Sequence, residues 1–204
     1  AYACTGAVRQ SSDQLAILYF AEQLKLNMEA KPAAVFWTMN LMPLLAVVGA
    51  LTAGIVSDKI FHGRRSPVAM GLYFLETLVI LIAASVILSG VVGPTPMGIF
   101  LGCLFLVLIA FTANSTHAII GTAAPMDIGG RKMAGFASGV VDSFQYYGPA
   151  IALPLTGWLI DRYGWNVWYP LMAGFGAIGG CSMLLVMRKQ RLMQRAGDPR
   201  ATSR

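Results

Sequence analysis

The sequence predicts an all-α, polytopic membrane protein built as a six-transmembrane-helix bundle, and three observations support this fold class. Hydrophobic residues make up 56% of the 204 residues and charged residues only 12%, whereas soluble domains carry roughly 25% charged residues. The apolar residues gather in six continuous runs, each close to the ~20 residues that a helix needs to cross a bilayer. The charged residues collect mainly in the short connections between these runs.

The six runs define the expected helices. Continuous apolar sequence predicts helices here, because a membrane-spanning strand would alternate apolar and polar residues over ~10 positions. The expected spans lie at about 1–21, 34–57, 67–90, 97–124, 133–158 and 165–187. We expect residues 1–187 to form one six-helix transmembrane half-domain and residues 188–204 to form a basic cytosolic tail. Because the chain starts at Ala1 inside an apolar run, we also expect part of the protein to lie upstream.

Prolines and small residues predict the shapes and contacts of these helices. A proline inside a membrane helix removes one backbone hydrogen bond and bends the helix. Such a bend is either a simple kink or a device for opening a cavity. The prolines of this kind are Pro43, Pro149 and Pro154. Small residues four apart predict close helix packing, and these pairs are Ala50 with Gly54, Gly135 with Gly139 and Gly176 with Gly180.

The basic residues predict the orientation in the membrane. Eleven of the fifteen follow the second, fourth and sixth spans: Lys59, Arg64, Arg65, Arg131, Lys132, Arg188, Lys189, Arg191, Arg195, Arg200 and Arg204. Only three lie in the other connections: Lys25, Lys31 and Arg162. The positive-inside rule therefore places the first group and both chain ends in the cytosol. An aromatic belt is expected at the opposite interface, formed by Tyr163, Trp165, Trp168 and Tyr169.

Ionisable residues inside the spans are the first candidates for function. A charge at the bilayer centre costs from ~3 to more than 10 kcal/mol, so each should face a partner or a water-filled cavity. Arg9 and Asp13 are four residues apart and share one helix face. They either form a mutual ion pair that tolerates the bilayer, or Arg9 faces a central cavity and presents its planar fork of donors to an anion.

Polar residues of the fourth and fifth spans are further candidates. Asn114 and His117 are three residues apart and share a face. His117 is either hydrogen-bonded inside the bundle or acts as a substrate ligand or proton-sensitive switch. Asp142, Gln145 and Tyr146 fall at positions i, i+3 and i+4. These three either line the same cavity or serve packing.

Several other classes of function are not expected. The net charge is +6, but the basic residues lie in turns and a tail rather than on one amphipathic face, so we expect no nucleic-acid partner. No metal-ligand spacing, nucleotide-binding loop or Ser/His/Asp arrangement is visible, so we expect neither a cofactor nor an enzyme. Cys4, Cys103 and Cys181 lie in apolar segments and are expected to be buried thiols. Glu76 is expected to be structural, either reaching toward the cytosolic surface or pairing with a basic group.

The connection between the second and third spans carries a family motif. Its pattern resembles the signature loop of the major facilitator superfamily, and the matching residues are Gly54, Asp58, Lys59, Gly63, Arg64 and Arg65. The longer spacing between Lys59 and Gly63 is similar to that of the organophosphate:phosphate antiporters, the glycerol-3-phosphate and hexose-phosphate transporters. Further stretches resemble the same branch: 133–139, 144–148, 157–165 and the pair His117-Ala118.

This resemblance implies an architecture and a binding site. The six spans would be helices seven to twelve of a twelve-helix fold, whose substrate binds between two six-helix halves near mid-membrane. The N-terminal half would be the missing partner. The family binds phosphate with one arginine from each half, and Ala7-Val8-Arg9 matches the position in the seventh helix. The resemblance thus assigns the anion to Arg9, with secondary contacts from Asn114, His117, Gln145 and Tyr146. Charge pairing or coupling would fall to Asp13 and Asp142.

The implied activity is secondary active transport across the plasma membrane, the inner membrane of a bacterium. The substrate would be a small organic anion, a phosphorylated metabolite such as glycerol-3-phosphate or a sugar phosphate, moved by alternating access in exchange for inorganic phosphate. The signature loop would hold the cytosolic helix ends together in the outward-facing state. Two alternatives remain open. One is a membrane sensor of sugar phosphates with the same fold. The other is a transporter of a non-phosphorylated anion, because Asp13 weakens the attraction of Arg9 for a dianion.

Overall fold

The computed structural model describes residues 1–196, without the side chains of residues 122–124, 126–131, 190, 191 and 193–196. Six long helices form the molecule: α1 (Tyr2–Glu22), α2 (Ala33–Lys59), α3 (Arg65–Leu88), α4 (Pro96–His117), α5 (Ala124–Tyr163) and α6 (Trp168–Ala196). Short 3-10 turns, Met28–Ala30 and Trp165–Val167, lie in two of the connections. The all-α class and the six-helix bundle predicted from the sequence are confirmed.

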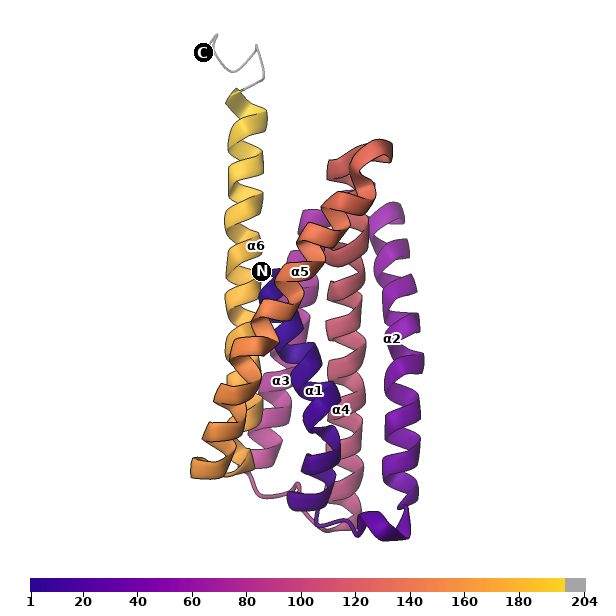
Figure 1. The fold of residues 1–204 in the computed structure, drawn as a ribbon, viewed down its shortest axis with the longest axis vertical. Coiled ribbons are helices and arrows are strands. Elements are labelled where there is room, and N and C mark those ends of the chain that lie inside the picture. The colour runs from indigo at the N-terminus through magenta and orange to yellow at the C-terminus, as the bar shows by residue number, and fades with distance from the viewer. Residues whose placement is uncertain (197–204) are drawn as a thin grey trace.

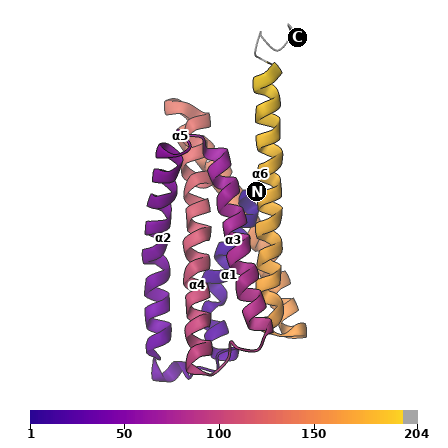
Figure 2. The same cartoon turned by 180° about the vertical axis from the view of Figure 1, so that it is seen from behind.

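The helices stand side by side, and successive helices run in opposite directions (Figure 1, Figure 2). Helix α1 contacts α4, α5 and α6. Helix α3 packs between α4 and α6, and α2 packs mainly on α4. Helix α5 crosses the others at a slant, and α6 extends beyond the bundle at one end (Figure 1). Since α6 continues to Ala196, the expected tail begins as a helical extension of the last span.

Within the part of the chain that the structure describes, four segments are long and apolar enough to cross a membrane. They are Ala33–Lys59, Arg65–Leu88, Pro96–Gly121 and Trp165–Lys189. Helices α1 and α5 lie outside this group. Both contain ionisable residues within their length, including Arg9 and Asp13 in α1 and Asp142 in α5. Most of the candidate site therefore lies on two helices outside the four most apolar segments.

The link between α4 and α5 differs from the expected loop. Helix α4 passes into a π-helical segment, Ala118–Ala123, which leads directly into the 40 residues of α5. Arg131 and Lys132 consequently belong to the first turns of α5 rather than to an open connection. π-helical turns are rare and often occur at functional sites. This one directly follows His117.

Glycines allow helices α1 and α5 to approach closely. A Cβ atom at Gly6 would collide with the carbonyl oxygen of Gln145, and one at Gly148 would collide with that of Ala3. Of the predicted small-residue pairs, Gly176 and Gly180 do pack against α3. Three glycines of the predicted pairs, Gly54, Gly135 and Gly139, meet no other helix among the described residues.

The expected aromatic belt is instead part of the core. Trp165, Trp168 and Tyr169 are buried against Tyr19 of α1, with ring centroids 5.1–5.9 Å from that of Tyr19, and only Tyr163 is exposed. Burial of these large rings fixes α6 to α1. The cysteines also differ from expectation, because Cys4 and Cys103 are half-buried and Cys181 is exposed.

Candidate functional site

Side chains from three helices meet in one polar cluster, which comprises Tyr2, Arg9, His117, Asp142 and Gln145. The Tyr2 hydroxyl lies 2.6 Å from Nδ1 of His117 and 3.3 Å from Oδ1 of Asp142. The Tyr2 and His117 rings are stacked, with centroids 5.6 Å apart and planes inclined by 12°. Tyr2 thus links helix α1 to α4 and α5 at a single hydroxyl group.

Gln145 joins the cluster to Arg9. Its fully buried amide, turned so that every neighbour is satisfied, accepts a hydrogen bond from Nη1 of Arg9 at 2.7 Å. The amide nitrogen then donates to Asp142 at 2.9 Å and to Tyr2 at 3.1 Å. One amide therefore bridges a cation and an anion. The Arg9 guanidinium is therefore bound directly by the neutral Gln145 and, through Gln145, is linked to the acidic Asp142.

Two glycines make this geometry possible. Gly6 brings α1 against the backbone of Gln145, as described above. Gly121, in the π-helical segment, faces Tyr2, and a Cβ atom there would collide with the Tyr2 hydroxyl. Only a residue without a side chain leaves room for the tyrosine at that point.

Two carboxylate side chains surround the single positive charge of Arg9. Oδ2 of Asp13 lies 4.0 Å from Nε of Arg9, and Asp142 reaches the arginine through Gln145. Nε of Arg9 is buried and has no hydrogen-bond partner among the described residues. The Arg9 side chain nevertheless keeps 27% of its surface exposed. Arg9 can therefore offer donors to a ligand, in competition with two carboxylates.

The structure unites four of the predicted site residues and leaves others apart. Arg9, His117, Asp142 and Gln145 share the cluster. The Asn114 amide is half-buried and donates to the carbonyl of Ala110 at 2.8 Å, so its hydrogen-bonding serves its own helix. The Tyr146 ring is 57% exposed and lies on an open face of α5.

Sequence analysis missed Tyr2. The signal that would have found it is helical spacing, because Tyr2, Gly6, Arg9 and Asp13 follow one another at three- or four-residue steps along one face of α1. A tyrosine in an apolar run carries no charge, and this one was overlooked for that reason.

The charged turn between α2 and α3 forms a second polar site at one end of the bundle. Arg65 donates to Oδ1 of Asp58 at 2.9 Å and to the Ser57 hydroxyl at 3.0 Å. The chain reverses direction at His62 and Gly63, whose φ angles are 52° and 78°, respectively. Glycine adopts a positive φ without strain. Asp58 and Arg65 thereby tie the end of α2 to the start of α3.

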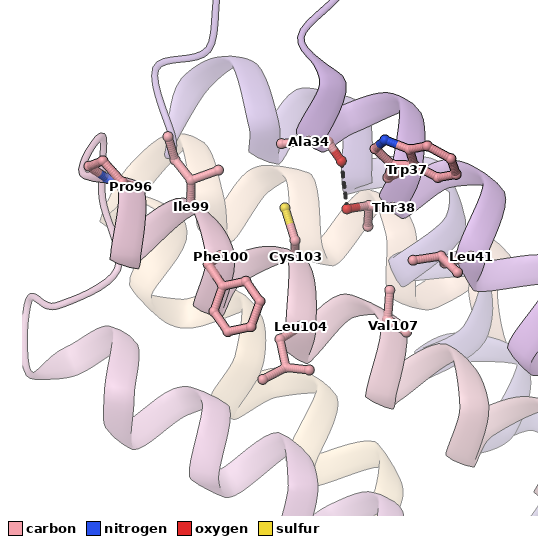
Figure 3. Close-up of a pocket in the computed structure, with 10 residues that line it drawn as sticks. All are labelled: Ala34, Trp37, Thr38, Leu41, Pro96, Ile99, Phe100, Cys103, Leu104 and Val107. Atoms are coloured by element: carbon pink, nitrogen blue, oxygen red, sulfur yellow. Dashed lines mark hydrogen bonds between the residues drawn. The ribbon is translucent and has the colours of Figure 1, made fainter.

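A cavity of about 430 Å³ lies between α2 and α4, away from both polar sites. Trp37 and Leu41 of α2 and Phe100 and Leu104 of α4 surround it (Figure 3). Its only hydroxyl, that of Thr38, donates to the carbonyl of Ala34 at 2.7 Å. The lining residues carry no charge, so the cavity lacks the cationic group that would bind an anion strongly.

Comparisons with known proteins identify related sequences. The sequence model of the Major Facilitator Superfamily matches residues 1–202. A glycerol-3-phosphate transporter of Haemophilus influenzae is 29% identical over 165 residues, 74% of this chain and 33% of that protein. The membrane sensor protein UhpC of Escherichia coli is 29% identical over 194 residues, 91% of this chain and 39% of that protein.

A glycerol-3-phosphate transporter of Bacillus subtilis is 30% identical over 131 residues, 64% of this chain and 28% of that protein. The chain thus spans about a third of the length of the curated relatives it matches.

Proposed function

We propose, from the premise that this chain belongs to the Major Facilitator Superfamily, that it is the C-terminal six-helix half of a secondary active transporter for small organic anions. The chain is a multi-pass membrane protein. Its partner would be an N-terminal half, with the substrate bound between the two. The observation that carries the proposal is Arg9, a partly exposed guanidinium held by Gln145 in helix α1.

The proposed substrate is a phosphorylated metabolite such as glycerol-3-phosphate or a sugar phosphate, exchanged for inorganic phosphate. Two relatives named for glycerol-3-phosphate transport support this class. The chemistry supports it as well, because a guanidinium binds phosphate through two parallel N–H donors. Gln145 occupies one terminal nitrogen from behind, which would orient the rest of the fork toward the ligand.

The remaining candidate residues would either contact the substrate or balance the charge of Arg9. His117 would contact the substrate or sense its charge, and Tyr146 would meet it from the exposed face of α5. Asn114, bonded to its own helix, would contribute through its carbonyl oxygen or after a change of rotamer. Asp13 and Asp142 would balance Arg9 between substrates, so that the arginine is neutralised when the site is empty.

The charged turn would act as the cytosolic gate. We place this turn and both chain ends on the cytosolic side of a bacterial inner membrane. Most of the basic residues lie in the turns and tail on this side of the bundle, and the positive-inside rule assigns such segments to the cytosol. The Asp58–Arg65 ion pair would hold the cytosolic helix ends together in the outward-facing state. Gly54 and Gly63 would shape the turn, and Lys59 and Arg64, both exposed, would add positive charge to it.

Substitution of Arg9 tests the proposal. In the full-length protein reconstituted in vesicles, we expect Arg9→Lys to abolish uptake of glycerol-3-phosphate and sugar phosphates while membrane insertion is retained, because an ammonium lacks the planar fork. Arg162→Lys, which alters an arginine stacked near Trp158 and Tyr163, is the matched control and should transport normally. Normal uptake by the Arg9 variant would remove Arg9 from the site.

A membrane sensor is the second candidate, because the match to the sensor protein UhpC covers 91% of this chain. A sensor would bind a sugar phosphate without moving it. Binding to the reconstituted full-length protein, measured beside uptake of the same labelled ligand, separates the two functions. Binding without uptake would favour the sensor.

A further inference from the structure

Glu76 is a buried acid that the proposed substrate site does not use. It lies in α3 with 0% of its surface exposed. Its Oε2 lies 3.3 Å from the Thr116 hydroxyl of α4, and its Oε1 has no hydrogen-bond partner among the described residues. The expectation that Glu76 would reach toward the membrane surface or pair with a basic group was wrong.

The Thr116 hydroxyl is shared between two acceptors. It lies 3.0 Å from the carbonyl oxygen of Thr112 and 3.3 Å from Oε2 of Glu76, and it can donate toward either. A hydroxyl has one hydrogen, so Oε2 receives only a shared hydrogen bond, and Oε1 receives none from the described residues. This supply of donors is poor for a buried carboxylate, so the contacts favour the neutral acid.

The surroundings of Glu76 favour the same state. The ion pairs between described residues, Arg9–Asp13 and Arg65–Asp58, do not include Glu76. The titratable groups that face it are Cys4 of α1 and Tyr73 of α3 itself, and α6 brings Gly176 and Gly179 against this part of α3. A carboxylate without a cation is strongly disfavoured in such a place, whereas a neutral carboxyl is tolerated.

Two helices connect Glu76 to the polar cluster. Helix α4 presents Thr116 to Glu76 and the next residue, His117, to Tyr2. Helix α1 presents Tyr2 to the cluster and Thr5 to the Tyr73 hydroxyl, 2.6 Å away. The π-helical segment that follows His117 makes the end of α4 irregular. A shift of α1 or α4 at the cluster would alter the surroundings of Glu76 as well.

We propose that Glu76 is a membrane-embedded proton-binding site. The part of this proposal that concerns transport rests on the proposed function. The acid holds its proton while α3 and α4 are packed. When the two helices separate, the carboxyl O–H bond breaks, a water molecule admitted to the gap takes the proton, and the carboxylate is left hydrated. Repacking requires that a proton be taken up again, and a cycle moves one proton across the membrane when release and uptake occur on opposite sides.

Infrared spectroscopy of the full-length protein tests the proton directly. We expect a carbonyl band of a protonated carboxyl group that Glu76→Gln removes, since the neutral amide keeps the shape and a donor toward Thr116. Glu29→Gln, which alters an exposed acid in the connection after α1, should keep the band. A spectrum unchanged by Glu76→Gln would overturn the proposal. Should that variant fail to insert, Thr116→Val must shift the band, and an unmoved band would overturn it equally.

Transport in vesicles tests the coupling. With equal inorganic phosphate on both sides of the vesicle membrane, a gradient of about one pH unit should drive about tenfold accumulation of glycerol-3-phosphate if one proton moves with each exchange. Glu76→Gln should equilibrate the substrate without responding to the gradient, and a response equal to that of the wild type would overturn the coupling. A wild-type protein that moves no organic phosphate would overturn the proposed function instead, and the infrared result would still decide the proton site.

Discussion

At the scale of single residues, Arg9 is held from one side and left open on the other. Gln145 accepts a hydrogen bond from Nη1, Asp13 approaches Nε, and the rest of the guanidinium is partly exposed. Its position depends on a network whose centre is the Tyr2 hydroxyl, which touches three other members of the polar cluster. The network, rather than the arginine alone, sets how the donors are presented.

Removal of the Tyr2 hydroxyl should therefore weaken substrate binding. We expect Tyr2→Phe to raise the apparent KM for the anion roughly tenfold, because a lost hydrogen bond to charged partners costs about 1.5–3 kcal/mol and ~1.4 kcal/mol is tenfold in affinity. The phenyl ring keeps its stacking on His117, so insertion should be unchanged. Tyr147→Phe, on the exposed face of α5, is the matched control. Equal effects of the two changes on uptake would contradict a role for the Tyr2 hydroxyl.

Residue chemistry made part of this site predictable. Arg9, His117, Asp142 and Gln145 are polar groups in apolar spans, and the high free-energy cost of burying them marks them in the sequence. Tyr2 and Gly121 could not be found in this way. Helical spacing places Tyr2 on the same face of α1 as Arg9. It does not show which residues of α4 and α5 meet that face, and the roles of Tyr2 and Gly121 depend on those contacts.

At the scale of helices, the contact between α1 and α5 shapes the site. Gly6 and Gly148 each meet a carbonyl oxygen of the other helix. Without these two residues, the helices would separate, and Gln145 would lose its reach to Arg9. The packing of two backbones thus sets the geometry of a side-chain network.

A methyl group at Gly148 should therefore destabilise the protein. Overpacking of a tight contact costs about 1–3 kcal/mol, which exceeds the gain of about 1 kcal/mol in helix propensity from glycine to alanine. We expect Gly148→Ala to lower the unfolding temperature of the full-length protein in detergent. Gly157→Ala, on the same helix but facing open space, should be neutral or slightly stabilising. The prediction fails if both variants unfold at the same temperature.

Helix boundaries show where sequence reasoning was strong and where it was weak. The apolar runs located all six helices, because hydrophobic length is a direct requirement of the bilayer. The link from α4 to α5 was misjudged, since Arg131 and Lys132 were taken to mark a loop and lie in a helix. The buried aromatic residues of α6 were misjudged for a related reason. A tryptophan near a helix end suits either an interface or a core, and only tertiary packing decides.

At the scale of the whole molecule, the predicted orientation follows from charge alone. Cysteine labelling in cells tests it on a full-length protein whose native cysteines are replaced. We expect His62→Cys, between α2 and α3, to react only with reagents that reach the cytosol. Gly93→Cys, between α3 and α4, should react with impermeant reagents added outside. The reverse pattern would invert the topology and move the proposed gate to the other face.

The gate can be tested by neutralising one partner of its ion pair. Asp58 is 63% exposed, and exposed pairs contribute about 0–1 kcal/mol, so Asp58→Asn should leave the unfolding temperature nearly unchanged. A bias of ~1 kcal/mol between two conformations still changes their ratio about fivefold. We therefore expect the variant to favour the inward-open state, with greater labelling of a cytosolic-cavity cysteine and slower exchange. Asp161→Asn, an exposed acid near the opposite end of the bundle, is the matched control. Labelling and exchange equal to those of the control would show that the Asp58–Arg65 pair joins α2 to α3 without controlling access to the site.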